Sequence, residues 1–89
     1  MKTIWKYPLD FKTDRFRLMV PKKAFPLTLR QDHMGQLNLW MAVDPEHEKV
    51  PAEIVIVGTG NELPADAGAF LETIFVGRFV FHAFYKEVE

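Results

Sequence analysis

Residues 37–43, Leu37-Asn38-Leu39-Trp40-Met41-Ala42-Val43, carry the alternation of a β-strand. Successive side chains of a strand point to opposite faces, so the pattern places four large apolar residues on one side. These are Leu37, Leu39, Met41 and Val43, while Trp40 and Ala42 lie on the other side. Apolar residues on both sides predict a strand that is covered on both of its faces.

Shorter runs of the same character flank this stretch and are separated by turn residues. An opening strand is expected over Ile4–Pro8, and it is predicted to stop at Pro8, which has no N–H for a ladder. In Phe25–Arg30 the alternation predicts that Phe25, Leu27 and Leu29 share one side. Further strands are predicted over Arg15–Val20, Glu53–Val57, Phe70–Val76 and Arg78–Val88.

About seven short strands in one small chain predict a mainly β fold. No segment of ten residues or more carries the 3.6-residue period of a helix. We therefore expect a single domain over residues 1–89, folded as a small antiparallel β-sandwich or barrel.

The composition, with 48% apolar and 26% charged residues, is that of one globular domain. Its eight Phe, two Trp and two Tyr are expected to build the core, since each ring buries roughly 150–250 Å². The chain has no cysteine, which fits a reducing compartment and excludes thiol catalysis. No stretch resembles a signal peptide or a membrane span, so a cytoplasmic protein without a membrane partner is expected.

The charge is divided unevenly along the chain. Residues 1–30 carry eight Lys or Arg against two Asp, a balance of +6, whereas residues 31–89 have a balance of −7. If the basic strands pair with acidic ones, the charges neutralise each other across the sheet. If they do not, the molecule has one basic and one acidic face, which favours self-association or docking on a charged partner.

Two polar segments are candidate ligand sites. Asp44, Glu46, His47 and Glu48 could offer oxygen ligands to Ca²⁺ or Mg²⁺, but the glycine of an EF-hand loop is missing. A solvated acidic turn is favoured there, and no metal or cofactor is expected. Gly58-Thr59-Gly60-Asn61 follows a predicted strand and could form an anion-binding nest. It lacks the further residues of a dinucleotide fingerprint or a P-loop, so a tight turn is favoured.

No catalytic constellation stands out. His82 lies between Val80 and Phe84 on one strand face, where a histidine is typically a core residue with one hydrogen bond. The chain has no serine, which excludes a serine nucleophile. General acid–base chemistry needs a converging pair of groups, and none is marked out. A non-enzymatic protein is therefore expected.

Aromatic residues interleave with the cations of the basic first third. This composition is typical of surfaces that bind single-stranded nucleic acid, where rings stack on bases and cations follow phosphates. The simpler interpretation is that Phe16 and Phe25 belong to the core and that the cations form the wet face of two strands. Nucleic acid is therefore not the favoured partner.

Four blocks resemble, in order and spacing, a family of short bacteriophage and prophage proteins of unknown function. They are Ile4-Trp5-Lys6-Tyr7, Leu39-Trp40 leading to Val43-Asp44-Pro45-Glu46, Gly58-Thr59-Gly60, and Val80-Phe81-His82-Ala83-Phe84. The chain departs from the family pattern at Lys23, where the family has glycine, at Asn61, where it has histidine, and at Gly77-Arg78, where it has two glycines. The resemblance implies a phage setting and transfers no functional residue.

The leading hypothesis is a phage accessory protein that binds and modulates a host protein, such as a component of a defence system. Large exposed aromatics serve as interface anchors, so its binding face is expected to include Trp5, Tyr7 and Trp40. One alternative is an oligomer that sequesters a nucleotide-like signal molecule, and another is a single-stranded nucleic-acid binder. The candidate binding residues are Trp5, Tyr7, Trp40, Arg15, Arg17, Gly58, Thr59, Gly60 and Asn61.

Overall fold

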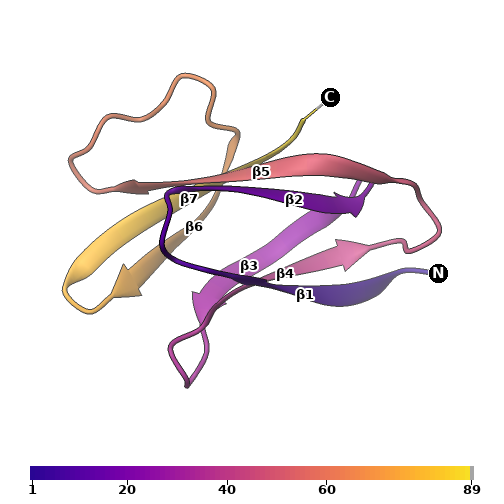
Figure 1. Ribbon diagram of the computed structural model, residues 1–89, viewed down its shortest axis with the longest axis horizontal. Coiled ribbons are helices and arrows are strands. Elements are labelled where there is room, and N and C mark those ends of the chain that lie inside the picture. The colour runs from indigo at the N-terminus through magenta and orange to yellow at the C-terminus, as the bar shows by residue number, and fades with distance from the viewer. Residues whose placement is uncertain (89) are drawn as a thin grey trace.

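A computed structural model describes residues 1–88 and shows seven strands in two antiparallel sheets (Figure 1). The strands are β1 (Thr3–Leu9), β2 (Arg15–Pro21), β3 (Phe25–Gln31), β4 (Leu37–Val43), β5 (Lys49–Gly58), β6 (Ala69–Val76) and β7 (Phe79–Glu87). The three-stranded sheet has the order β1-β4-β3, and the four-stranded sheet has the order β2-β5-β7-β6. The predicted mainly β antiparallel fold is confirmed, as two packed sheets rather than a closed barrel.

The core lies between the two sheets and is built by one face of each. From β4, the residues Leu37, Leu39, Met41 and Val43 are all buried, as the alternation of residues 37–43 predicts. They pack with Ile54, Ile56, Ala83 and Tyr85 of the four-stranded sheet. β4 is the central strand of its sheet, because it pairs with β1 on one side and β3 on the other.

Three strand predictions were wrong. Residues 37–43 are not covered on both faces, because within the described residues no further layer lies on the outward side of β1-β4-β3. The other two concern prolines on edge strands. β1 does not stop at Pro8 but continues to Leu9, because an edge strand needs hydrogen bonds on one side only. Phe25, Leu27 and Leu29 do not share a side, because the register of β3 against β4 shifts between Pro26 and Thr28. This bulge leaves Leu29 fully buried and Phe25 65% exposed.

The basic first third and the acidic remainder of the chain meet within one molecule. β2 pairs with β5, which brings the Arg15 guanidinium onto the Glu53 carboxylate. At the opposite end of the same strand pair, Lys22 Nζ lies 4.0 Å from Glu48 Oε1. The charges of the four-stranded sheet therefore neutralise each other across strands.

Candidate functional site

The outward side of the three-stranded sheet presents aromatic and cationic side chains together. We call it the outer face and define it by Ile4, Lys6, Phe25, Thr28, Arg30, Trp40 and Ala42. The strand register produces this set, because paired residues of neighbouring strands point to the same side of a sheet. Ala42 pairs with both Ile4 and Phe25, and Trp40 pairs with both Lys6 and Thr28.

The outer face exposes large apolar side chains that do not serve the core. Ile4 is 60% exposed and Phe25 is 65% exposed on either side of Ala42, while Trp40, next to Ala42 on the same side of β4, is half-buried. A Trp supported by neighbouring strands and flanked by exposed apolar groups has the anatomy of an interface centre. The face can therefore bury apolar area against a partner without rearranging the fold.

The strands of the outer face contribute cations only, although two carboxylates reach its edge, where Glu72 accepts from Thr28 and Asp32 accepts from Asn38. β1, β3 and β4 contain no Asp or Glu, and their only charged residues are Lys6 and Arg30. Neither cation takes part in an ion pair within residues 1–88. Lys6 and Arg30 are therefore available to carboxylate or phosphate groups beside the apolar side chains of the face.

The structure does not bring Trp5, Tyr7 and Trp40 onto one surface. Trp5 and Tyr7 pair with the buried residues Met41 and Leu39, so they point into the space between the sheets, opposite to Trp40. Burial raises the pKa of Tyr7, which identifies it as part of the core boundary. Trp5 packs against the core as well, with Lys49 Nζ 5.9 Å from its ring centroid. Only Trp40 of the three belongs to the outer face.

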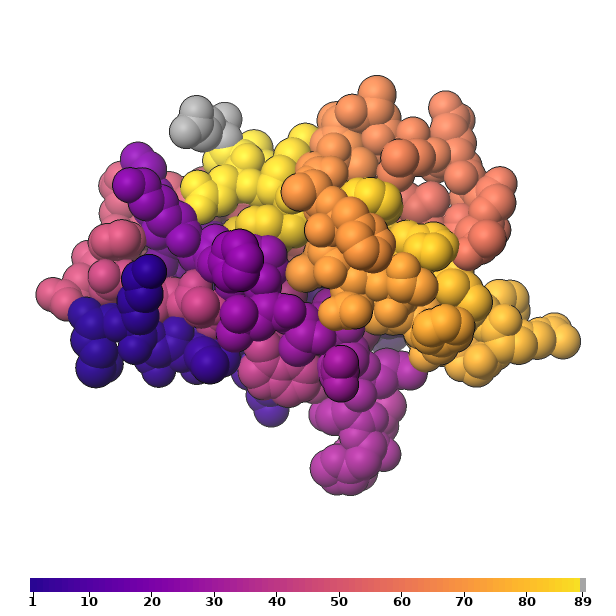
Figure 2. All heavy atoms as spheres, turned by 180° about the vertical axis from the view of Figure 1, so that it is seen from behind, coloured from indigo at the N-terminus to yellow at the C-terminus, as the bar shows by residue number. Residues whose placement is uncertain are grey.

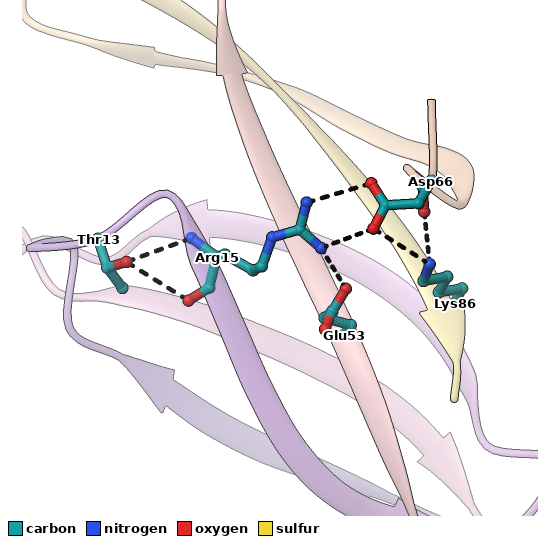
Figure 3. A network of polar contacts seen from close by, with 5 residues as sticks. All are labelled: Thr13, Arg15, Glu53, Asp66 and Lys86. Atoms are coloured by element: carbon teal, nitrogen blue, oxygen red, sulfur yellow. Dashed lines mark hydrogen bonds and ion pairs between the residues drawn. The ribbon is translucent and has the colours of Figure 1, made fainter. Parts of the chain in front are cut away.

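Arg15 is engaged by acidic groups of its own chain. Figure 3 shows its guanidinium between Glu53 of β5 and Asp66 of the loop that follows, with a hydrogen bond of 3.2 Å from Nη2 to Asp66 Oδ1. Lys86 of β7 approaches the same Asp66 carboxylate at 3.8 Å. Arg17 lies beside Arg15 on the same side of β2, opposite Glu53 in the strand register, and is exposed. Arg15 is thus a structural clamp rather than a free cation.

Gly58-Thr59-Gly60-Asn61 forms the predicted tight turn at the exit of β5. Its amides are largely occupied, since Thr59 N donates to Val80 O at 3.1 Å and Asn61 N donates to Gly58 O at 3.0 Å. Gly58 and Asn61 of the turn border a cavity of about 200 Å³ that is also lined by Asp14, Arg15 and Glu62. The turn also borders a second cavity of about 680 Å³, which is lined by Arg78 and Phe79 and by no acidic residue. The first cavity mixes carboxylates with a cation that is already engaged in ion pairs, and the second offers the cation Arg78, so the signal-molecule alternative stays a prediction.

His82 is bonded on both ring nitrogens and is half-buried. Nε2 lies 2.8 Å from Thr59 Oγ1, and Nδ1 lies 3.0 Å from Thr73 Oγ1. The Thr59 hydroxyl also donates to Val80 O at 3.1 Å, so it accepts from Nε2–H. The imidazole therefore ties the turn to two strands, with one more hydrogen bond than the sequence predicts.

The acidic segment after β4 also serves the fold. Asp44 Oδ1 accepts from Glu46 N at 3.1 Å, and this bond lowers the pKa of Asp44. The Met1 amine lies 3.1 Å from Glu46 Oε2, and His47 Nδ1 lies 2.9 Å from Lys22 O. Within residues 1–88 no group of three acidic or imidazole side chains is arranged to hold a metal ion.

Sequence reasoning missed most of the outer face. Phe25 seemed a core residue because the bulge that turns it outward has no pattern of its own, and Lys6 and Arg30 were not singled out. One partial signal was present: the segments that form β1 to β4 lack acidic residues, whereas β5, β6 and β7 each contain one, but β2 shares this feature and lies in the other sheet. Strand order was needed to show that β1, β3 and β4 lie together.

Residues 1–89 match the family described as Domain of unknown function (DUF7352), and the chain belongs to that family. No curated protein and no solved structure matches the chain. The phage setting implied by the resemblance stays a prediction. The part of the chain that the structure describes contains no helix long and apolar enough to cross a membrane.

Proposed function

We propose that this chain is a binding protein that docks on a protein partner through its outer face and thereby modulates that partner. In the phage setting that the resemblance implies, the partner is a host factor, such as a component of a defence system. The observation that carries the proposal is the outer face of β1-β4-β3, which exposes large apolar side chains beside two cations that have no ion pair within residues 1–88.

The arrangement on the outer face supports a protein partner. Trp, Arg and large apolar residues supply most of the binding energy at protein interfaces, and they act from the centre of a patch. Trp40 is central in the strand register, Ile4 and Phe25 lie on its apolar side, and Lys6 and Arg30 provide a basic rim. A complementary partner surface is apolar at its centre and acidic at its edge.

Affinity capture from a lysate of the bacterial host tests the proposal. The wild-type chain is compared with Phe25→Asp and with Met34→Asp, a matched control whose exposed methionine lies on the β3–β4 loop outside the outer face. Phe25→Asp should lower retention of the captured protein at least tenfold. The new carboxylate removes an apolar contact and lies close to the acidic edge expected on the partner, which repels it. Met34→Asp should leave retention unchanged.

The affinity for the captured protein must also depend on the positive charges at the rim of the outer face. Lys6→Glu should weaken binding of the purified partner by about fivefold, and added salt should weaken the wild-type complex. Equal retention by wild type and Phe25→Asp would contradict the proposal, whatever protein is captured.

The same face supports single-stranded nucleic acid as a second candidate, because Trp40 has cations on either side along the sheet. Titration of a fluorescent 12-nucleotide strand distinguishes the two. If the strand is the ligand, the logarithm of its affinity should fall with the logarithm of salt concentration with a slope of about −1.4, for two phosphate contacts. Trp40→Ala should then weaken binding of the strand, because it removes the ring on which a base stacks. If the strand does not bind even at low salt, the protein partner remains the favoured ligand.

A further inference from the structure

The core-facing side of the four-stranded sheet continues past the end of the other sheet. On β7 this side is formed by alternate residues, of which Ala83 and Tyr85 are buried in the core. Phe81 is half-buried, and Phe79 at the start of the strand is 58% exposed. Figure 1 and Figure 2 show the cause, because the turn between β6 and β7 projects beyond the three-stranded sheet. Two phenylalanine rings therefore stand at this end without a strand opposite them in the described chain.

The two rings form one wall of the cavity of about 680 Å³ that lies beside the turn after β5. Their centroids are 6.3 Å apart, and the ring planes are inclined by 37°. The opposite wall is the turn itself, which is fixed against β7 because Thr59 N donates to Val80 O at 3.1 Å. Small-molecule sites are cavities of roughly 300–1,000 Å³ with mainly apolar walls and a few polar groups. This cavity has the size and the apolar wall of such a site.

Among the described residues, the walls of this cavity carry one charged group, the guanidinium of Arg78. Arg78 takes part in no ion pair within residues 1–88, and its guanidinium carbon lies 5.6 Å from the ring centroid of Phe79. A cation–π contact therefore holds the charge beside the exposed ring. Asp14 and Glu62 line the neighbouring cavity and not this one. The cavity thus offers a guanidinium, which binds phosphate or carboxylate through two parallel hydrogen bonds.

A second polar group, the carboxamide of Asn61, lines the same cavity. A methyl group at Gly58 would stand 3.0 Å from Asn61 Nδ2, so the glycine leaves room for the carboxamide against the end of β5. The Asn61 side chain makes no hydrogen bond within residues 1–88. A carboxamide both donates and accepts, so it can pair with the polar edge of a ring that lies in the cavity.

We propose that the cavity between the turn after β5 and the β6–β7 turn binds a small molecule with one planar aromatic ring system and one anionic group. The ring stacks on Phe79, the anionic group pairs with Arg78, and Asn61 bonds the polar edge of the ring. Nucleotides and aromatic carboxylates share this chemistry. The site goes beyond the proposed docking function, because no residue that defines the outer face lines the cavity.

Nuclear magnetic resonance titration of the ¹⁵N-labelled chain tests the proposal with adenosine monophosphate as the probe. The probe should shift the amide signals of Arg78 and Phe79 and the carboxamide signals of Asn61, with half-saturation near about 1 mM. Adenosine lacks the anionic group and ribose phosphate lacks the ring, so each should bind about fivefold more weakly. Indoleacetate distinguishes the two sources of the anion. Tighter binding of indoleacetate than of the nucleotide assigns the site to aromatic carboxylates, and weaker binding assigns it to phosphates.

Two variants with matched controls separate the charge contact from the stacking contact. Arg78→Gln should remove the preference for adenosine monophosphate over adenosine, whereas Arg17→Gln, at an exposed arginine outside the cavity, should keep that preference. Phe79→Leu keeps an apolar side chain but removes the ring, so both ligands should bind about fivefold more weakly. Phe75→Leu is its control, because Phe75 is 71% exposed on the opposite side of the same hairpin. All four replaced side chains are exposed, and circular dichroism should show an unchanged fold.

Three outcomes would overturn the proposal: no shift at Arg78 and Phe79 with about 5 mM nucleotide, equal binding of the nucleotide and adenosine, or undiminished binding by folded Arg78→Gln. Shifts confined to Lys6 and Trp40 would place the ligand on the outer face and would overturn the proposal as well. Failure of the cavity leaves the docking proposal untouched, because Phe25→Asp and Arg78→Gln act on different surfaces.

Discussion

The outward sides of the two sheets are treated differently by the same chain. On the four-stranded sheet, the loop of residues 59–68 folds across the strands, and Asp66 is held there by Arg15 and Lys86 (Figure 3). As a result Val55, which points outward in the register with Arg15, is only 4% exposed. On the three-stranded sheet no such loop exists within residues 1–88, and Phe25 stays 65% exposed.

This difference separates residues that stabilise the chain from residues that are available to a partner. Arg15 and Lys86 of the four-stranded sheet pair with carboxylates of the same molecule, whereas Arg17 and Lys49 of that sheet and Lys6 and Arg30 of the other have no ion pair within the described residues. Internal pairing therefore accounts for Arg15 but not for Lys6 or Arg30. What distinguishes Lys6 and Arg30 is their place beside exposed apolar side chains, which is the feature that the proposed docking would use.

Among the tests of the difference between the covered and the bare sheet, the largest change in the free energy of unfolding is expected at Gly68, where the covering loop joins β6. A methyl group at Gly68 would stand 2.1 Å from the Tyr85 carbonyl oxygen, so Gly68→Ala must push the loop away from β7. We expect unfolding to become easier by about 2–3 kcal/mol, measured by urea denaturation. Gly35→Ala, which meets no atom but keeps a φ of +83°, is the control and should cost about 1 kcal/mol.

The next largest change in the free energy of unfolding is expected when threonine is placed on the outward side of each sheet in turn. Val55→Thr puts a hydroxyl under the loop without a partner and should cost about 1–2 kcal/mol. Phe25→Thr on the outer face should change the free energy of unfolding by no more than about 0.5 kcal/mol. Equal costs at the two positions, measured by urea denaturation, would remove the distinction between a covered and a bare side.

A smaller and opposite effect is expected where the chain crosses from one sheet to the other. Lys23 has a φ of +65° in the turn between β2 and β3, where Ala24 N donates to Pro21 O at 3.0 Å. Side chains make this backbone region costly, so Lys23→Gly should stabilise the chain by about 1 kcal/mol. Glycine keeps the N–H that donates to Glu87 Oε2 at 2.8 Å. An unchanged or lower urea midpoint would contradict the expectation.

Strand-forming stretches could be predicted well because they depend on local alternation. Residues 37–43 show this, since the four alternate residues Leu37, Leu39, Met41 and Val43 are all buried. Lys23, where the resemblance implies a glycine, has a φ of +65°. Both signals are local and lie within a few residues of the feature concerned.

The candidate site could not be predicted because it depends on long-range order. Lys6, Phe25 and Trp40 lie on one surface only because β4 separates β1 from β3, and no local pattern encodes that order. The bulge between Pro26 and Thr28 then reverses the side on which Phe25 lies. Trp5 and Trp40 had similar local surroundings in the sequence, yet they lie on opposite sides of the sheet.

The smallest effect tests the clamp that holds the covering loop. Arg15→Met removes the guanidinium between Glu53 and Asp66, both of which keep access to solvent. Exposed ion pairs contribute little, so the melting temperature at pH 7 should fall by only about 2–4 °C. Arg17→Met is the matched control, because Arg17 lies on the same strand side without an ion pair in residues 1–88. It should leave the melting temperature unchanged.

The pH dependence identifies the source of this effect. The hydrogen bond from Arg15 lowers the pKa of Asp66 in the folded chain, with the charge of Arg15 acting in the same direction. A lowered carboxyl pKa stabilises the folded state above the unfolded pKa of about 3.9, and that stabilisation is lost as pH falls through the folded value. The difference in melting temperature between wild type and Arg15→Met should therefore be constant from pH 5 to 7 and shrink below about pH 4. A difference that persists at pH 2 would show that Arg15 acts through packing of its aliphatic stem, and the loop would then be held by contact rather than by charge.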